Sequence, residues 1–164
     1  MPRVFLGVGS NVNAEANLRL GIRELRALYG ELTISPVYRN KPVGFEGEDF
    51  LNLVVAFDTT DPVEQIADHI EAIHRHAGRV RGEAKFASRS LDIDILLYGQ
   101  KVSKGPPAVL PRPDVLQYSF VLKPLADLAP DAVHPETGAR FARHWQLMER
   151  QGSHALQRVW LDPD

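Results

Sequence analysis

The chain contains no cysteine among its 164 residues, and this absence excludes several kinds of protein chemistry at once. The protein can form no disulfide, use no thiolate nucleophile and bind no metal through cysteine. The absence also fits a reducing compartment, so we expect a cytoplasmic protein.

Long apolar runs are missing as well. The first apolar run reaches Gly7, and then the polar pair Ser10 and Asn11, too early for the apolar region of a signal peptide. No later run approaches the roughly 20 apolar residues of a membrane-spanning helix. We therefore expect no signal peptide and no membrane partner.

The chain also lacks a large excess of positive or negative charge. The 19 basic and 21 acidic side chains leave a net charge of −2, which gives no long-range electrostatic reason to bind nucleic acid. No internal repeat or low-complexity linker divides the chain, and its length is sufficient for one hydrophobic core. We expect a single domain over residues 1–164 that does not bind nucleic acid, and we expect it to be a monomer.

Apolar periodicity predicts alternating strands and helices in the first part of the chain. The strands are expected at residues 4–8, 31–39, 50–60 and 89–99, and the helices at residues 13–30 and 62–78. Gly9, Ser10 and Asn11 are expected to form a tight turn, and Asp61 to cap the second helix. This order matches a ferredoxin-like α+β unit, in which an antiparallel sheet carries its helices on one face.

The pattern after Gly99 is less regular. It predicts a short hairpin around Val102, helical structure within residues 115–128 and 141–150, and a last strand at residues 156–161.

The segment 89–99, RSLDIDILLYG, carries two acids within an apolar strand pattern. Successive side chains of a strand point to opposite faces, so Asp92 and Asp94 share one face while Leu91, Ile93 and Ile95 share the other. Two neighbouring carboxylates in an apolar setting repel each other unless a cation lies between them. A hard ion such as Mg²⁺ suits them, whereas an edge strand with both acids in water is the alternative.

Arginines precede this acidic strand, among them Arg79, Arg81 and Arg89. Guanidinium groups beside a carboxylate-bound metal are typical of phosphoryl-transfer sites, because both bind phosphate oxygens. Basic loops without such acids are most often solvated surface. The combination therefore predicts chemistry on a phosphate chain.

Aromatic side chains flank the polar segments, namely Phe45, Phe50, Phe86 and Phe120. Flat rings at such positions can stack on a planar heterocycle, and the amide of Asn52 can bind its edge. Packing of the same rings in the core is the alternative.

Seven short segments, taken together, resemble the 6-hydroxymethyl-7,8-dihydropterin pyrophosphokinase family. They are GSN at 9–11, SPVY at 35–38, KPVG at 41–44, DFLN at 49–52, GRVR at 78–81, RSLDIDILLYG at 89–99 and FVLKPL at 120–125. The resemblance implies a ferredoxin-like α/β/α sandwich with a mostly antiparallel sheet. It also implies transfer of pyrophosphate from ATP to the hydroxymethyl group of the pterin, which yields AMP and the pterin diphosphate for folate biosynthesis.

The resemblance assigns roles at the phosphate end of the site. Asp92 and Asp94 would hold two Mg²⁺ ions on the triphosphate of ATP, and Arg81 and Arg89 would bind phosphates as further catalytic residues. In the pterin slot, Phe50 and Phe120 would stack on the heterocycle. Asn52, together with backbone groups around Asn40 and Val43, would bind its edge.

Several positions that contact ATP in the family differ in this chain. His74 stands where an acid is usual, Phe86 where a tryptophan is usual, Arg112 replaces a histidine and Tyr118 an arginine. We expect His74, Phe86 and Arg112 to contact ATP with Arg81 and Arg89, and Arg112 to replace the charge missing at Tyr118. A catalytically weak paralogue that binds a pterin or nucleotide, or an enzyme for a different pterin-like acceptor, is the alternative.

Overall fold

The computed structural model describes residues 1–78, 91–152 and 155–161 of the chain. Its strands are β1 (Arg3–Ser10), β2 (Thr33–Ile34), β3 (Val37–Asn40), β4 (Phe50–Asp58), β5 (Asp92–Tyr98) and β6 (Gln157–Val159). Its helices are α1 (Ala14–Tyr29), α2 (Val63–His76), α3 (Asp114–Gln117), α4 (Ser119–Leu128) and α5 (Phe141–Arg150).

The strands form one sheet in the order β5-β1-β4-β3-β6, with β2 paired to β4. Every pairing is antiparallel. Strand β1 lies between β5 and β4, so chain segments far apart in sequence meet across its length. The strand and helix order of the first part of the chain, and the antiparallel sheet, are as predicted.

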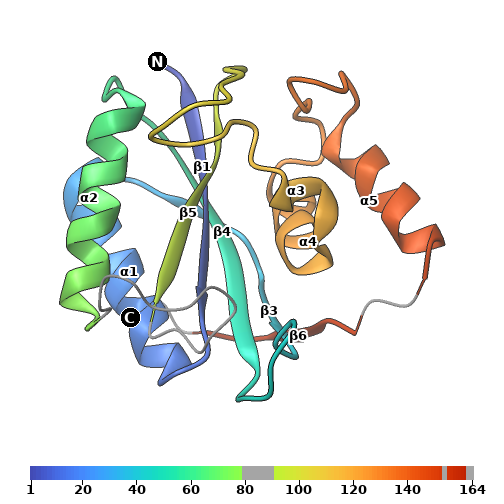
Figure 1. Ribbon diagram of the computed structural model, residues 1–164, viewed down its shortest axis with the longest axis horizontal. Helices are drawn as coiled ribbons and strands as arrows, with labels where there is room; N and C mark the ends of the chain where they lie inside the picture. The colour runs from blue at the N-terminus through green and yellow to red at the C-terminus, as the bar shows by residue number, and fades with distance from the viewer. Residues whose placement is uncertain (79–90, 153–154, 162–164) are drawn as a thin grey trace.

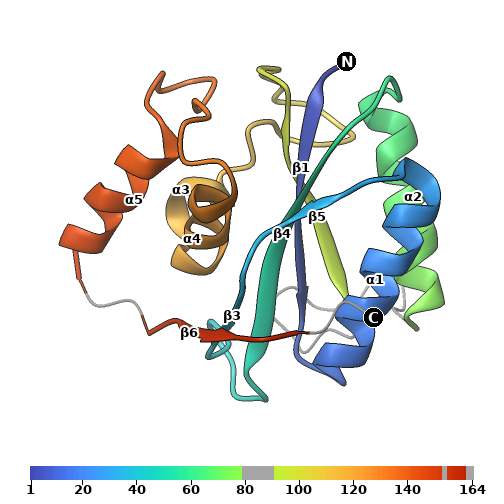
Figure 2. The same ribbon diagram turned by 180° about the vertical axis from the view of Figure 1, so that it is seen from behind.

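Helices cover both faces of this sheet (Figures 1 and 2). Helices α1 and α2 lie on one face, and α3, α4 and α5 lie on the other. The three layers confirm the sandwich that the resemblance implied, and α1 and α2 share one face, as the ferredoxin-like order of the first part of the chain predicted. The later helices supply the second layer, and their arrangement on the sheet is not encoded in periodicity.

Period-two alternation divides the core between these faces. Val4, Leu6 and Val8 of β1 join the buried cluster that includes the apolar faces of α1 and α2. Phe5 belongs to the second cluster, with Leu122 of α4 and other residues of the later helices. In β4 and β5, the side chains at even positions point to the face that carries α4. The polar side chains at even positions therefore lie on that face as well.

Three sequence predictions need correction. The strand expected at residues 31–39 is interrupted between β2 and β3, where Pro36 has no N–H to donate. Asp61 does not cap α2, because the residue before the helix is Pro62 and no side chain bonds to the helix start. Gly9 and Ser10 belong to β1 rather than to a turn, since both are paired with residues of β4.

Candidate active site

Asp92 and Asp94 lie on the same face of β5, as the alternation predicted. Across the neighbouring strand, Asp92 is paired with Gly9 and Asp94 with Gly7. Gly9 is in turn paired with Asn52 of β4. Asp92, Gly9 and Asn52 thus lie in one row across three strands. Because Gly9 has no side chain, no side chain of β1 stands between the carboxylate of Asp92 and the amide of Asn52 in this row.

Gly9 has no Cβ because the Asn52 amide occupies that space. A Cβ built at Gly9 would lie 2.3 Å from Oδ1 of Asn52, far inside any permitted contact. Asn52 Nδ2 donates a hydrogen bond of 2.7 Å to Oδ1 of Asn40 on β3. Asn40 Nδ2 donates in turn to the carbonyl of Lys41 at 3.0 Å. This chain of bonds aims Oδ1 of Asn52 toward the acidic side of the sheet.

Position 9 therefore requires glycine because the Asn52 side chain approaches the backbone closely, and not because the chain turns there. Sequence reasoning missed the role of Gly9, although an isolated glycine within a strand pattern is the usual signal of such an approach.

Arg112 reaches the acids from the segment before α3. Its backbone N–H donates to the carbonyl of Leu96 on β5 at 3.0 Å. Its guanidinium lies 3.6 Å from Asp94 and 3.3 Å from Asp114. Burial lowers the pKa of this guanidinium, but the carboxylates of Asp94, Asp114 and Asp92 more than offset it, so that the pKa is raised. A permanent cation thus lies beside the acidic pair.

Two aromatic pairs stand near the predicted pterin slot. Phe120, at the start of α4, stacks on Tyr118 with ring centroids 5.1 Å apart and planes 21° apart. Phe50, at the start of β4, contacts the ring of Phe45 edge to face at 6.2 Å. Helix α4 packs on β3 and β4, the strands that carry Asn40 and Asn52. Val43 lies exposed in the loop between those strands.

Helix α4 is fastened to β3 by a polar contact that the sequence did not reveal. The hydroxyl of Tyr38 on β3 donates to the carboxylate of Asp127 on α4. Lys123 Nζ contacts the other carboxylate oxygen of Asp127 at 2.8 Å. Burial and the Asp127 carboxylate raise the pKa of the Tyr38 hydroxyl, so the hydroxyl keeps its proton and donates.

His74 lies on α2, on the other side of β5. The ring is 3% exposed, and its Nε2 accepts a hydrogen bond of 2.9 Å from the backbone N–H of Ile93, between the two acids. Its Nδ1 lies 3.5 Å from Oε1 of Glu71. The predicted ATP contact at His74 stays a prediction. Arg81, Phe86 and Arg89 lie outside the described residues.

The acidic pair suits a hard divalent ion. No group of three or more His, Cys, Asp or Glu side chains able to hold a metal occurs within residues 1–78, 91–152 and 155–161. Mg²⁺ needs no such cage, since it typically takes one or two carboxylates and completes its shell with water and phosphate oxygens. The partly exposed Asp92 and Asp94 fit that ligand set.

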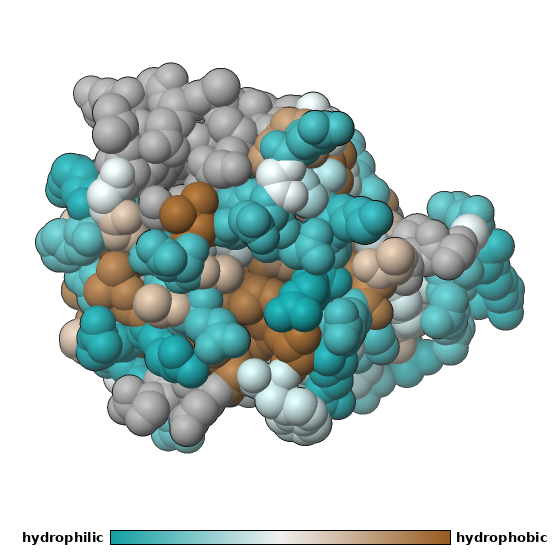
Figure 3. Space-filling view, turned by 90° about the horizontal axis from the view of Figure 1, so that it is seen from below, coloured by the Kyte–Doolittle hydropathy of each residue, from teal (hydrophilic) through white to brown (hydrophobic). Residues whose placement is uncertain are grey.

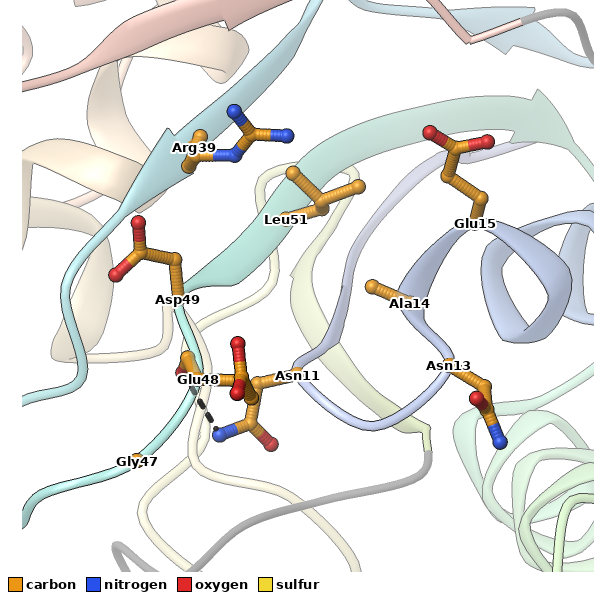
Figure 4. Close-up of a pocket in the computed structure, with 9 residues that line it drawn as sticks. All are labelled: Asn11, Asn13, Ala14, Glu15, Arg39, Gly47, Glu48, Asp49 and Leu51. Carbon is orange, nitrogen blue, oxygen red and sulfur yellow. Dashed lines mark hydrogen bonds between the residues drawn. The ribbon is translucent and has the colours of Figure 1, made fainter.

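A separate polar cavity of about 610 Å³ lies at the same end of the sheet but on its other face (Figure 4). Arg39 and Leu51 line it, and they alternate in sequence with Asn40 and Asn52 of the site. Asn11 bonds there to the carbonyl of Glu48 at 3.1 Å. Within the described part of the chain, none of the predicted site residues lines this cavity. Viewed from this end, the molecule shows a hydrophobic area framed by hydrophilic residues (Figure 3).

No helix in the described part of the chain is long and apolar enough to span a membrane.

Comparison with known proteins gives consistent matches. A model of the family 7,8-dihydro-6-hydroxymethylpterin-pyrophosphokinase (HPPK) matches residues 5–130. The chain is 33% identical over 137 residues to the 2-amino-4-hydroxy-6-hydroxymethyldihydropteridine pyrophosphokinase of Aquifex aeolicus, covering 82% of the chain and 85% of that protein. It is 37% identical over 137 residues to the protein of the same name from Methylorubrum extorquens, covering 81% of the chain and 86% of that protein.

Two longer proteins also match. The folic acid synthesis protein fol1 of Pneumocystis carinii is 34% identical over 146 residues, but the chain covers only 20% of its length. The crystal structure of wild-type Plasmodium falciparum HPPK-DHPS matches with a TM-score of 0.73 at 13% identity, over 98% of this chain and 48% of that one. At that identity the structural likeness shows the fold alone. The chain spans less than half the length of either protein.

Proposed function

Because the chain belongs to the 7,8-dihydro-6-hydroxymethylpterin-pyrophosphokinase family, we propose that Asp92, Asp94 and Arg112 form the phosphate end of its active site. Asn52 and Phe120 form the pterin end. The reaction of the family is transfer of pyrophosphate from ATP to 6-hydroxymethyl-7,8-dihydropterin in folate biosynthesis, and the chain is an ATP-dependent diphosphokinase of this kind.

The acids act as metal ligands in this proposal. Asp92 and Asp94 would hold two Mg²⁺ ions, which supply positive charge to the triphosphate as its negative charge shifts during transfer. The support is geometric, because both carboxylates project from one face of a strand that is fixed by pairing with β1. Phosphoryl transfer requires mainly positioning and neutralisation of charge, so the remaining side chains need to bind and orient the substrates.

Arg112 binds phosphate oxygens in this proposal. Its 3.6 Å separation from Asp94 is too long for a strong hydrogen bond, so the guanidinium can turn toward a phosphate at little cost. Asp114 and the Leu96 carbonyl keep the arginine beside β5 while it does so. Arg81, Arg89 and Phe86 are further proposed contacts of ATP.

The pterin end uses the amide and the rings. An asparagine amide has two N–H donors and one carbonyl acceptor, and Asn52 commits one N–H to Asn40. The rest of the amide can pair with the donor and acceptor edge of a pterin. The rings of Phe50 and Phe120 supply stacking surfaces, and backbone groups near Asn40 and Val43 complete the slot.

The row of Asp92, Gly9 and Asn52 across three strands is the observation that carries this assignment, because it joins a metal-binding group to a heterocycle-binding group. The test is release of AMP from ATP in the presence of Mg²⁺ and 6-hydroxymethyl-7,8-dihydropterin. We expect stoichiometric AMP and pterin diphosphate. Pterin binding without AMP release would instead favour the weak paralogue or another acceptor.

The expectations of a monomer and of a cytoplasmic location stay predictions.

A further inference from the structure

We propose that His74 is a positioning residue, which orients the Asp92 carboxylate by holding the backbone of β5 from the helix side. The proposal rests on the assignment of Asp92 and Asp94 as metal ligands, and it differs from an ATP contact at His74. Its basis is the hydrogen bond from the Ile93 N–H to Nε2 of His74, 2.9 Å long.

Strand β5 is the outer strand of the described sheet, since it pairs with β1 on one side only. The backbone groups on the outer side of such a strand have no neighbouring strand to bind. Helix α2 takes that place at one point, where it presents the His74 ring to the amide between the two acids. The ring is buried, so water does not compete for this bond.

Fixing this N–H fixes the direction of the Asp92 side chain. The N–H belongs to the peptide unit that joins Asp92 to Ile93, and that unit is planar. The Ile93 side chain is anchored separately, with 2% exposure in the cluster that contains α1 and α2. With the peptide plane and the isoleucine both held, the carboxylate of Asp92 can leave the strand only toward the face that carries Asn52.

The orientation of the imidazole follows from its partners. Because Nε2 accepts a hydrogen bond from the Ile93 N–H, it carries no proton, and the proton of the ring lies on Nδ1, which faces Glu71 at 3.5 Å. The neighbouring histidines of α2 make other contacts. His69 bonds to Tyr29, and His76 bonds to Glu24 of α1. His76 is therefore a control residue from the same helix, because its hydrogen bond goes to α1 and not to β5.

The experiment compares His74→Gln with His74→Asn in the full chain. Glutamine can place its carbonyl oxygen where Nε2 lies, whereas asparagine carries the same amide one methylene short of Ile93. Groups that orient metal ligands typically change metal affinity or activity about 10- to 100-fold when they are removed. We expect His74→Asn to raise the KM for Mg·ATP by about tenfold or more, and His74→Gln to restore most of the loss.

Amide hydrogen exchange in the substrate-free protein supplies a readout that is independent of activity. We expect the Ile93 amide to exchange faster in His74→Asn than in the parent protein, and His74→Gln and His76→Gln to leave it protected. Pterin affinity should be unchanged in all three variants. Unchanged Ile93 exchange and an unchanged KM in His74→Asn would overturn the proposal.

Two further results separate the alternatives. Equal loss of ATP affinity in both His74 variants, with Ile93 still protected, would mean that His74 contacts ATP directly and would also overturn the proposal. If Asp92→Asn keeps full activity while Ile93 exchange responds to His74→Asn, the metal assignment fails. The proposal that His74 positions a metal ligand then fails as well, although the hydrogen bond between His74 and Ile93 is confirmed.

Discussion

At the scale of single residues, the site depends on the absence of a side chain at Gly9. Asn52 can bring its Oδ1 to the side of the acidic strand only because no Cβ stands in the way. The neighbouring Gly7 is less constrained, since a Cβ there would meet the Leu96 side chain at 3.4 Å. Two glycines on the same face of β1 therefore differ sharply in what they tolerate.

Substituting Gly9→Ala tests this difference. The new methyl group must displace the Asn52 amide, and a displacement of about 1 Å in a binding group can cost roughly 100-fold in function. We expect pterin affinity to fall at least about tenfold in isothermal titration, with Gly7→Ala as the matched control that keeps near-normal affinity. Equal affinity in both variants would show that Asn52 does not bind the pterin.

Arg112 is the second residue whose role can be measured alone. Removing a charge-assisted hydrogen bond typically costs about 1.5–3 kcal/mol, or roughly 10- to 100-fold in affinity. We expect Arg112→Ala to raise the KM for ATP by such a factor without changing pterin affinity, and Arg112→Lys to recover part of the loss. Unchanged ATP affinity in Arg112→Ala would contradict the idea that this arginine replaces the charge missing at Tyr118.

At the scale of elements, the pterin slot depends on how α4 lies over β3. Asp127 accepts the Tyr38 hydroxyl from the strand and contacts Lys123 within the helix, so one carboxylate joins the two elements. Because α4 carries Phe120 and β3 carries Asn40, this contact also sets where the proposed stacking ring stands relative to the amide groups. We therefore expect stability and pterin binding to be coupled at this point.

Tyr38→Phe removes only the hydroxyl. We expect the free energy of unfolding to fall by about 1–3 kcal/mol in urea titrations, because the hydroxyl bonds to a carboxylate, and pterin affinity to fall with it. Tyr98→Phe is the control, since its hydroxyl donates to the carbonyl of Asp61 at 2.8 Å rather than to α4. A loss of pterin affinity of the same size in both variants would contradict the coupling.

His134, in the segment between α4 and α5, and His144 of α5 are expected to make stability depend on pH. Burial lowers the pKa of His134 and of His144 below the ordinary 6.5 of histidine, and the two rings lie 5.6 Å apart. The unfolded chain therefore binds more protons than the folded chain below about pH 6.5. Stability from these groups is complete above that pH and is lost as the pH falls toward the lowered values.

His134→Asn isolates this effect. Nδ1 of His134 accepts the N–H groups of Glu136 and Thr137 at 3.2 Å, and an asparagine oxygen can take the same position without titrating. We expect the difference in unfolding free energy between pH 7.5 and pH 5 to be smaller in the variant than in the parent. An identical pH profile would show that His134 is not the titrating group.

At the scale of the whole molecule, the predictable parts of the fold are those with strong periodicity. The bounds of α5 and the shared face of Asp92 and Asp94 follow from helical and strand periods, which depend only on local sequence. The break at Pro36 follows from its missing N–H and not from such periods. The place of Gly9 within β1 depends on the Asn52 side chain that the neighbouring strand brings close. Arg112 could be placed beside Asp94 only by the chain path after β5.

The same distinction applies to the site. A resemblance in motifs could name the acids, the amide and the rings, but it could not show that His74 is buried behind Ile93 or that Tyr38 holds α4. These contacts join elements that are distant in sequence and consist of single hydrogen bonds, which leave no pattern along the chain.

The central claim is that Asp92 and Asp94 hold the metal for pyrophosphate transfer, and turnover of the two asparagine variants tests it most directly. Metal ligands of this kind contribute several kcal/mol to the transition state, so AMP release should fall by about 100-fold or more in Asp92→Asn and in Asp94→Asn. Pterin binding measured without nucleotide should stay near that of the parent protein. Retained turnover in both variants would contradict the account.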